Sequence, residues 1–369
     1  MGPRSVSGPV IDRHAANAGR RPGGGSPVVT AVSEGERRVS RWQRAAGLGC
    51  AFLIAVVASV STGQPAGATP PRLGDSARIL AVSSETATRT TMTVYSAAMK
   101  RPVRVSVLAP RDRTGPRPTV YLLDGIDGGV YTSYTQSGWT FQTDIARFVA
   151  DKKVNVVLPI GGTGSYYTDW RRIDPVLGRN MWETFLTEEL PPLVDGRFRG
   201  NGRNVIGGLS MGALGAMSIA VRNPDLYRGV VAFSGCLDQG SPEFRQATAT
   251  SVTTRGGNPE NMWGPLDHDN WDAHNPAGHV SALRGKPVYV AVGNGLPDPA
   301  LGLAGLASPV GGVLEGIVAR CTESFKRRAD RAGVDITYDF RAGLHSWGYW
   351  NQDLHRAWPT IARALKSAG

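Results

Sequence analysis

One ten-residue segment constrains the fold of this chain more than any other. In Asn204-Val-Ile-Gly-Gly-Leu-Ser-Met-Gly-Ala213, an apolar strand pattern runs into Gly208-x-Ser210-x-Gly212 and then into small residues. This order of strand, serine and helix is typical of a nucleophile elbow. The serine occupies a strained turn, so the residues two before and two after it must be small enough for strand and helix to approach each other. The segment therefore predicts an α/β fold in which Ser210 is a nucleophile.

From residue 78 onward, short β-rich runs alternate with helical stretches, the pattern of an open α/β sheet with crossover connections. We predict one α/β-hydrolase catalytic domain over residues 69–369, with a mostly parallel central sheet and helices on both faces. The expected strands are 88–95, 103–108, 118–123, 154–159, 203–206, 229–233, 287–292 and 336–340, the first two antiparallel. The expected helices are 139–151, 180–194, 211–222, 311–332 and 351–367. Residues 240–279 and 296–309 are expected to be long loops.

Residues 1–68 have a different character, with eight basic and three acidic residues, a Gly/Pro-rich patch and one apolar run over 45–60. Arginines precede that run, and Ala66-Gly67-Ala68 supplies the small-x-small pattern of a cleavage site. We predict a secretory signal peptide with a long n-region over residues 1–68, removed on export. A membrane anchor is the alternative, although spanning a bilayer needs about 20 apolar residues.

The formal charge of +11 falls to +6 without the leader, and the remaining Lys and Arg residues are scattered. This pattern does not indicate a nucleic-acid partner. We expect a secreted protein that associates weakly with the cell envelope. Cys236 and Cys321 remain after export, and an even pair in an oxidising compartment predicts one disulfide. Two buried free thiols are the alternative.

A serine hydroxyl needs a base, which this fold places after the last strand. His345 fits that position, whereas His355 lies inside the expected final helix and is more typical of a surface or packing residue. The acid has two candidates. Asp298 follows the strand 287–292, and Glu315 begins the next expected helix, where a glutamate is also favoured by the helix dipole. Spacing alone does not choose between them.

Acyl transfer also needs two backbone N–H donors for the oxyanion. Met211, directly after the serine, is the first, and Ile126 in the turn Leu122-Leu-Asp-Gly-Ile126 is our choice for the second. A histidine and aspartate cluster at 267–279 invites a metal interpretation, but its spacing matches no helical or finger site. We therefore expect no metal and no cofactor, because this chemistry needs only the triad and the two donors.

With these residues, the sequence resembles the antigen 85 mycolyltransferases, also called diacylglycerol acyltransferase/mycolyltransferases, of actinobacteria that carry mycolic acids. The similarity covers most of the chain after residue 68, and the final motif below is the most specific. The motifs are Tyr121-Leu-Leu-Asp-Gly-Ile, Pro159-Ile-Gly-Gly, Ser165-Tyr-Tyr-Thr-Asp-Trp170, Gly208-Leu-Ser-Met, Asn261-Met-Trp-Gly-Pro265, Gly293-Asn-Gly, Leu314-Glu-Gly and His345-Ser-Trp-Gly-Tyr-Trp350.

The resemblance implies Ser210 as nucleophile and His345 as base. It implies Glu315 as the acid, because the family's acid sits in a Leu-Glu-Gly segment, and it also implies oxyanion donors at Ile126 and Met211.

The resemblance further implies substrate contacts. Asp124 would contact a sugar, Trp347 would line the acceptor site, and residues 296–309 would form an apolar flap over the acyl chain. The chain departs from the family at Asp127, where antigen 85 proteins carry an arginine. That departure reverses a charge beside the expected sugar site.

The implied function is a secreted serine acyltransferase that moves a mycolyl group from trehalose monomycolate, through an acyl-enzyme, to a second trehalose monomycolate or to cell-wall arabinogalactan. A secreted carboxylesterase, which gives the acyl group to water, is the first alternative. A non-enzymatic wall-binding protein is the second.

Overall fold

The computed structural model describes residues 2, 76–299 and 309–366. The chain divides into two units, Met1–Gly67 and Ala68–Gly369, and almost all described residues belong to the second. The predicted signal peptide and most of the predicted flap lie outside the described residues, so both stay predictions. Within the described ranges, no helix is long and apolar enough to cross a membrane.

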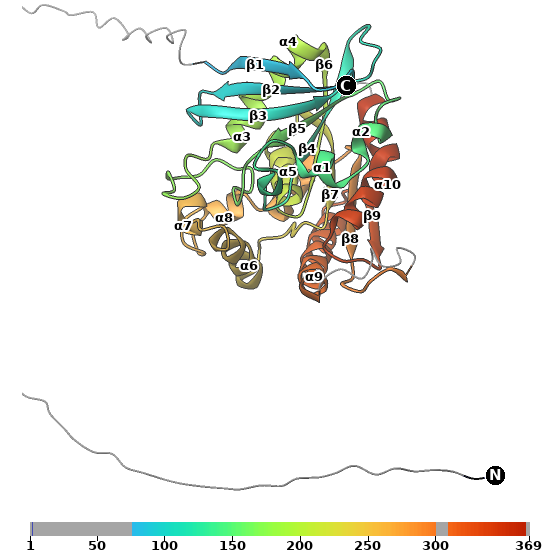
Figure 1. Ribbon diagram of the computed structural model, residues 1–369. Coiled ribbons are helices and arrows are strands. Elements are labelled where there is room, and N and C mark those ends of the chain that lie inside the picture. The colour runs from blue at the N-terminus through green and yellow to red at the C-terminus, as the bar shows by residue number, and fades with distance from the viewer. Residues whose placement is uncertain (1, 3–75, 300–308, 367–369) are drawn as a thin grey trace, which may run out of the picture. The chain divides into compact units, whose positions relative to one another are not determined.

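The described part of the second unit is built on one nine-stranded sheet with the order β1-β2-β3-β5-β4-β6-β7-β8-β9 (Figure 1). Strands β1, β2, β3 and β5 pair antiparallel, and every neighbouring pair from β5 across to β9 is parallel. The mostly parallel sheet is therefore confirmed. The strands are β1 (Arg78–Ser84), β2 (Arg89–Ser96), β3 (Arg101–Leu108), β4 (Arg117–Leu123), β5 (Asn155–Ile160), β6 (Gly200–Leu209), β7 (Tyr227–Phe233), β8 (Val288–Gly293) and β9 (Thr337–Arg341).

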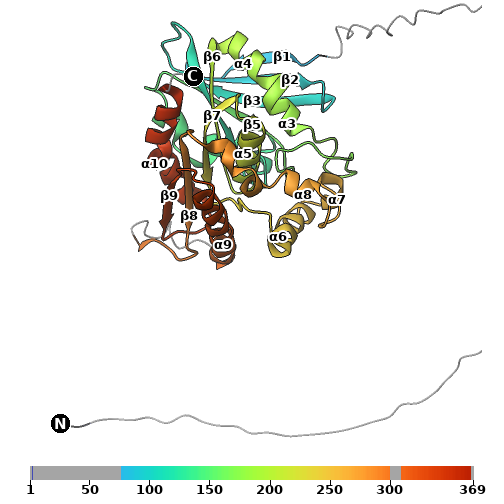
Figure 2. The ribbon, with the colours of Figure 1, turned by 180° about the vertical axis from the view of Figure 1, so that it is seen from behind.

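Helices cover both faces of this sheet, as predicted. One face carries α1 (Gly138–Gln142), α2 (Ile145–Phe148) and α10 (Trp347–Lys366). The opposite face, turned to the viewer in Figure 2, carries α3 (Trp182–Thr184), α4 (Leu190–Phe198), α5 (Met211–Arg222) and α9 (Pro309–Arg331). Each layer has its own apolar core, and every residue of β5 and β8 is buried because both sides of these strands are covered.

Two predicted helices are interrupted. The helix expected over 139–151 is two short helices, because Thr143 adopts an extended conformation and its hydroxyl accepts the N–H of Ile145. The helix expected over 180–194 contains a π-helical turn at Phe185–Glu189 before α4. Pro191 and Pro192, directly after Leu190, cannot donate the backbone hydrogen bonds that a regular α-helix needs there.

Two other predictions were wrong in extent. Residues 240–279, expected to be a loop, contain α6 (Pro242–Thr253), α7 (Pro259–Met262) and α8 (Asn270–Ala273). Ser241 and Asn258 cap the first two of these helices, each just before a proline, which is a start signal readable in the sequence.

The final helix begins at Trp347 rather than Asn351. Strand β1 was not predicted, because it is an exposed edge strand without apolar alternation.

The close backbone contacts of β6 and α5 with each other and with the end of β4 explain the glycines around Ser210. A Cβ at Gly208 would lie 2.5 Å from the carbonyl oxygen of Gly212 and 3.0 Å from that of Leu123. A Cβ at Gly212 would lie 2.4 Å from the carbonyl oxygen of Asp124. Both neighbours are backbone atoms that cannot move aside, so only glycine fits at either position.

The substitution Gly208→Ala should therefore destabilise the fold by about 1–3 kcal/mol and lower the melting temperature, because the added methyl group overpacks the elbow. Gly196→Ala is the matched control, since its Cβ would have no neighbour within 4 Å and it lies in α4. That change should be neutral or stabilise by about 0.4–1 kcal/mol. Thermal and urea unfolding would measure both, and equal effects of the two variants would contradict this account.

Candidate active site

Ser210 stands at the carboxyl end of β6, between the strand and the first residue of α5. Its backbone has φ 53° and ψ −121°, a strained conformation for a residue with a side chain. The conformation is held because the N–H of Ser210 donates to the carbonyl oxygen of Phe233 at 2.8 Å. The turn presents the hydroxyl group at the carboxyl edge of the sheet, where α/β folds bind ligands.

His345 connects Ser210 with Glu315. Its Nε2 lies 2.9 Å from the Ser210 Oγ, and its Nδ1 lies 2.7 Å from Oε2 of Glu315. Since the carboxylate can only accept, Nδ1 carries the imidazole proton and Nε2 accepts from the serine hydroxyl. His345 lies in the loop between β9 and α10, and Glu315 lies on α9, fully buried. The structure thus brings together the three residues that the resemblance implied.

The carboxylate at hydrogen-bonding distance from His345 is that of Glu315, and not that of Asp298. The backbone N–H of Asp298 donates to the Tyr349 hydroxyl at 2.9 Å. His355, on α10, contacts Asp144 at 2.9 Å. This is the surface role expected for His355.

Two further donors hold the buried carboxylate of Glu315. Its Oε1 accepts from the Ser234 hydroxyl at 2.7 Å and from the Gly293 N–H at 2.6 Å. The Ser234 oxygen in turn accepts from the indole N–H of Trp350 at 2.9 Å, and the Trp350 ring lies edge-on to His345 at 4.9 Å. Sequence analysis missed Ser234. Its position directly after the strand β7 was the only available signal, whereas Gly293 and Trp350 belong to motifs already noted.

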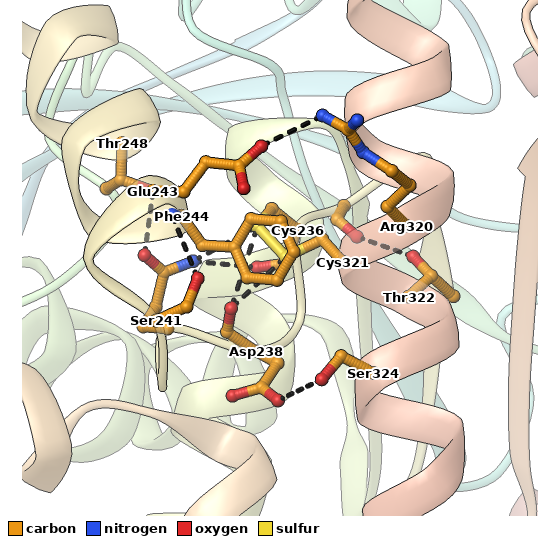
Figure 3. The surroundings of a disulfide bond; sticks show 12 residues. Cys236, Asp238, Ser241, Glu243, Phe244, Thr248, Arg320, Cys321, Thr322 and Ser324 are labelled. Atoms are coloured by element: carbon orange, nitrogen blue, oxygen red, sulfur yellow. Dashed lines mark hydrogen bonds and ion pairs between the residues drawn. A yellow bond between two sulfur atoms is a disulfide. The ribbon is translucent and has the colours of Figure 1, made fainter.

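A disulfide between Cys236 and Cys321 ties the segment after β7 to helix α9 (Figure 3). Its sulfur atoms come from two elements that also carry Ser234 and Glu315. The Thr322 hydroxyl donates to the Gly235 carbonyl oxygen at 3.0 Å beside the bridge. The predicted disulfide is therefore present. It fixes the helix that carries the acid against the strand end that carries a donor to it.

Polar contacts continue this connection along α9. Asp238 accepts from the Ser324 hydroxyl at 2.8 Å and forms an ion pair with Arg328 at 2.9 Å. Glu243 pairs with Arg320 at 2.9 Å on the exposed side (Figure 3). The side chain of Asp238 is almost completely buried, so its charge needs these donors.

The two predicted oxyanion donors flank the serine. A Cβ built on Gly125 would lie 3.6 Å from the Ser210 Cβ, which places the turn before Ile126 against the nucleophile. Neither the N–H of Ile126 nor that of Met211 donates to an acceptor within the described residues. Met211 is the first residue of α5, whose N–H has no partner inside the helix. Both groups are available to a ligand oxygen at the serine.

A cavity of about 420 Å³ opens above the serine. Ser210 and His345 form its base, and its wall includes Asp124, Ile126, Asp127, Tyr131, Phe141, Leu314 and Trp347. Its rim is apolar and accessible, with exposed fractions of 72% for Tyr131 and 55% for Phe141. The indole of Trp347 packs edge-on against Trp139 at 5.6 Å, so this side chain both packs and lines the cavity.

Asp124 lies buried in the wall of this cavity. Its carboxyl oxygens accept from the Ser137 hydroxyl at 3.0 Å and from the Gly138 N–H at 3.1 Å. Burial raises the pKa of Asp124 to about 7, although these two donors act in the opposite direction. Near neutral pH this group therefore titrates within reach of a ligand in the cavity.

Asp127 does not leave an uncompensated negative charge at the cavity. Its carboxylate forms an ion pair with Arg255 at 2.7 Å, and both side chains are about 29% exposed. Arg255 follows α6, 128 residues away along the chain. The charge reversal expected from Asp127 is thus offset by a cation from a different segment.

The histidine cluster is used in packing. His274 is buried, stacks on Trp263 at 5.0 Å, and hydrogen-bonds the Asn270 carbonyl oxygen at 2.8 Å. His279 contacts the Asp272 carbonyl oxygen at 3.2 Å. The described residues contain no group of three or more His, Cys, Asp or Glu side chains arranged to hold a metal ion.

Comparison with known proteins agrees with this arrangement. The chain matches the esterase family, described as "Putative esterase", over residues 96–361, which places it in the esterase class of α/β-hydrolase-fold proteins. It is 32% identical over 260 residues to the diacylglycerol acyltransferase/mycolyltransferase Ag85A of Mycobacterium tuberculosis, covering 67% of this chain and 74% of the relative. Ag85B of Mycolicibacterium smegmatis is 32% identical over 259 residues, covering 67% and 77%. The chain belongs to this diacylglycerol acyltransferase/mycolyltransferase family, which confirms the resemblance.

Solved structures agree as well. The crystal structure of Mycobacterium tuberculosis MPT51 (FbpC1) is similar, with 27% identity, a TM-score of 0.61, and coverage of 73% of this chain and 96% of that one. An S-formylglutathione hydrolase from Agrobacterium tumefaciens shares the fold at 20% identity and a TM-score of 0.57, covering 78% and 99%. The relatives together support acyl transfer or ester hydrolysis as the activity of this chain.

The contact between Ser234 and Glu315 can be tested by Ser234→Ala. Removing this hydroxyl takes one of three donors from the buried carboxylate, so His345 should be held less firmly. We expect kcat for ester cleavage to fall about tenfold, with a smaller change in KM, because Ser234 itself does not line the cavity and reaches it only through Trp350. Ser218→Ala is the matched control, since the Ser218 hydroxyl is also buried but bonds the His274 carbonyl oxygen. Equal loss of kcat in both variants would contradict a positioning role.

The buried carboxyl of Asp124 predicts a pH-dependent stability. Its folded pKa of about 7 exceeds the ordinary value of 3.8, so the folded state holds a proton that the unfolded state has released between these values. The contribution of this group to stability therefore falls as pH rises from about 4 to 7. Asp124→Asn removes this penalty.

The difference in melting temperature between Asp124→Asn and the unaltered protein should accordingly shift in favour of the variant from pH 4 to pH 8. Other titrating groups are common to both proteins and cancel in the comparison. Asp267→Asn, at an exposed aspartate outside the cavity, is the matched control. A constant difference for Asp124→Asn would contradict the raised pKa.

Proposed function

We propose that this chain is a secreted serine acyltransferase that moves a mycolyl group from trehalose monomycolate to a second trehalose monomycolate or to cell-wall arabinogalactan. The observation that carries the proposal is the Ser210-His345-Glu315 arrangement at the base of a cavity with an apolar rim. The names of the Ag85A and Ag85B relatives support the mycolyl group as cargo. Residues 1–68 would act as the export signal, and residues 69–369 as the catalytic domain.

In the first step, the Ser210 Oγ attacks the ester carbonyl carbon while Nε2 of His345 takes its proton. The carbonyl oxygen becomes an oxyanion that accepts from the N–H groups of Ile126 and Met211. Collapse of the tetrahedral species breaks the bond to the sugar oxygen, which leaves with the proton from His345. The acyl group stays on Ser210, and Glu315 stabilises the transient imidazolium.

In the second step, an acceptor hydroxyl gives its proton to Nε2 and its oxygen attacks the acyl-enzyme, which releases Ser210. Asp124 would contact the sugar, with Trp347 lining the acceptor side of the cavity and Asp127 acting through its pair with Arg255. Apolar side chains at the rim, among them Tyr131 and Phe141, suit a long acyl chain. The chemistry needs no metal or cofactor.

A secreted carboxylesterase is the second candidate, because the esterase-class match and the triad geometry suit water as acceptor equally well. The two functions differ in product and not in nucleophile.

Incubation of the purified protein with trehalose monomycolate, followed by thin-layer chromatography and mass spectrometry, tests the proposal. We expect trehalose dimycolate and free trehalose. Ser210→Ala should lower the rate by on the order of 10⁵–10⁶, because the nucleophile is lost. Ser281→Ala, at an exposed serine, is the control and should keep full activity. Free mycolic acid without dimycolate would replace the transferase with the esterase, and retained activity in Ser210→Ala would exclude both.

A further inference from the structure

A second hollow, of about 600 Å³, lies beside the active-site cavity. It is formed where the first residues of β3 meet the segment after β5 and the loop 176–180. Arg104 on β3 pairs with Ile160 at the carboxyl end of β5, so the hollow opens at the sheet edge that also carries Ser210. The N–H of Gly161 donates to the Gly128 carbonyl oxygen at 2.7 Å, and this contact separates the hollow from the cavity.

The charge of this hollow has one sign. Arg101 and Arg104 line it, and the described residues that complete the lining include no aspartate or glutamate. Neither arginine has a carboxylate within 4.0 Å in the described part of the chain, in contrast to Arg255 and Arg341, which are both paired. Two cations from the same strand, β3, therefore line this hollow without a counter-charge among the described lining residues.

Of the two arginines, Arg101 is the stronger indication of an anion-binding site, because its side chain is half-buried. Its guanidinium lies 5.6 Å from the centre of the Trp182 ring, and its Nη2 contacts only the Met99 sulfur, at 3.5 Å. Burial lowers the pKa of the Arg101 guanidinium, as expected for a desolvated cation. A partly buried charge without an ionic partner is costly in a folded protein, and an oxyanion bound beside it would lower that cost.

The remaining lining suits a sugar. Tyr134 and Thr163 supply polar side chains, and Tyr134 is 41% exposed. The Tyr134 and Thr163 hydroxyls lie 3.0 Å apart, and the Thr163 hydroxyl donates to the Asp127 carbonyl oxygen at 2.8 Å. Asp127 lines the active-site cavity, so the two concave surfaces share one wall.

We propose that this hollow is a binding site for a saccharide bearing an oxyanion, with Arg101 and Arg104 holding the phosphate or carboxylate group. An arginine fork matches either group in two hydrogen bonds, and an accessible tyrosine ring suits the apolar face of a sugar. The site does not depend on which acyl acceptor the enzyme uses. The hollow lies next to Asp127, so a charged sugar unit of a glycan can bind here while the neighbouring sugar unit reaches the active-site cavity.

Titration calorimetry of the full protein with glucose 1-phosphate, glucuronate and glucose tests the site. We expect at least one anionic sugar to bind, the neutral sugar to bind at least tenfold more weakly, and added NaCl to weaken anion binding. The phosphate and carboxylate arms identify which oxyanion is preferred.

Arg101→Gln and Arg104→Gln should each weaken binding of the anionic sugar about tenfold or more, because each removes a charged hydrogen-bond donor. Arg104 is exposed, so its replacement should not disturb folding, and the Arg104 variant tests the site even where the Arg101 variant folds poorly. Arg172→Gln, at an exposed arginine outside the hollow, should bind as the unaltered protein does.

Cleavage of a short p-nitrophenyl ester should be unchanged in the Arg104 variant, which separates this site from the catalytic one. The proposal is overturned where neither anionic sugar binds, where glucose binds as tightly, or where Arg172→Gln weakens binding as much as Arg104→Gln.

Discussion

The buried carboxylate of Glu315 is the charge on which the geometry of the site depends. A fully buried carboxylate is tolerated only when its oxygens accept hydrogen bonds, and here three donors supply them: His345, Ser234 and the Gly293 N–H. These donors come from the loop after β9 and from the ends of β7 and β8. Satisfying one charge therefore fixes three strand ends relative to α9, and the imidazole is aimed at Ser210 as a consequence. The disulfide between Cys236 and Cys321 adds a covalent tie between two of these elements.

Features carried by a contiguous motif could be predicted from the sequence, whereas features that depend on contacts across the fold could not. The elbow at Ser210 was predictable because its motif, Gly208-x-Ser210-x-Gly212, is contiguous in the sequence, although the backbone atoms that exclude a Cβ at Gly212 belong to Leu123 and Asp124. His345 followed from chain order. The acid was not decided by spacing, since Asp298 and Glu315 both follow β8, and only the contact across the fold distinguishes them. Ser234 carries no pattern of its own, because an ordinary serine becomes a positioning residue only when α9 brings a carboxylate to it.

The charges around the cavity also depend on contacts across the fold that the sequence alone does not reveal. From the sequence alone, Asp127 reverses a charge beside the expected sugar site, yet its partner Arg255 lies in the turn after α6, in a segment that was expected to be one long loop. No local pattern links residues 128 positions apart. Asp124 is similar, since its raised pKa follows from complete burial rather than from its neighbours in sequence. Both acidic groups thus present less negative charge to a ligand at neutral pH than composition suggests.

This lowered charge bears on the choice between a sugar hydroxyl and water as acceptor. Both acceptors need the same base and the same oxyanion donors, so the triad cannot discriminate between them. Discrimination must come from binding energy that a sugar has and water lacks. A neutral Asp124 can donate to a sugar oxygen as well as accept, and the Asp127–Arg255 pair presents both signs of charge at one rim. In the proposed reaction, an acceptor that occupies these groups would displace water from the acyl-enzyme, and the apolar side chains of Tyr131 and Phe141 line the same cavity. Under the proposed function, a preference for transfer would therefore reside in the cavity wall and not in the catalytic residues.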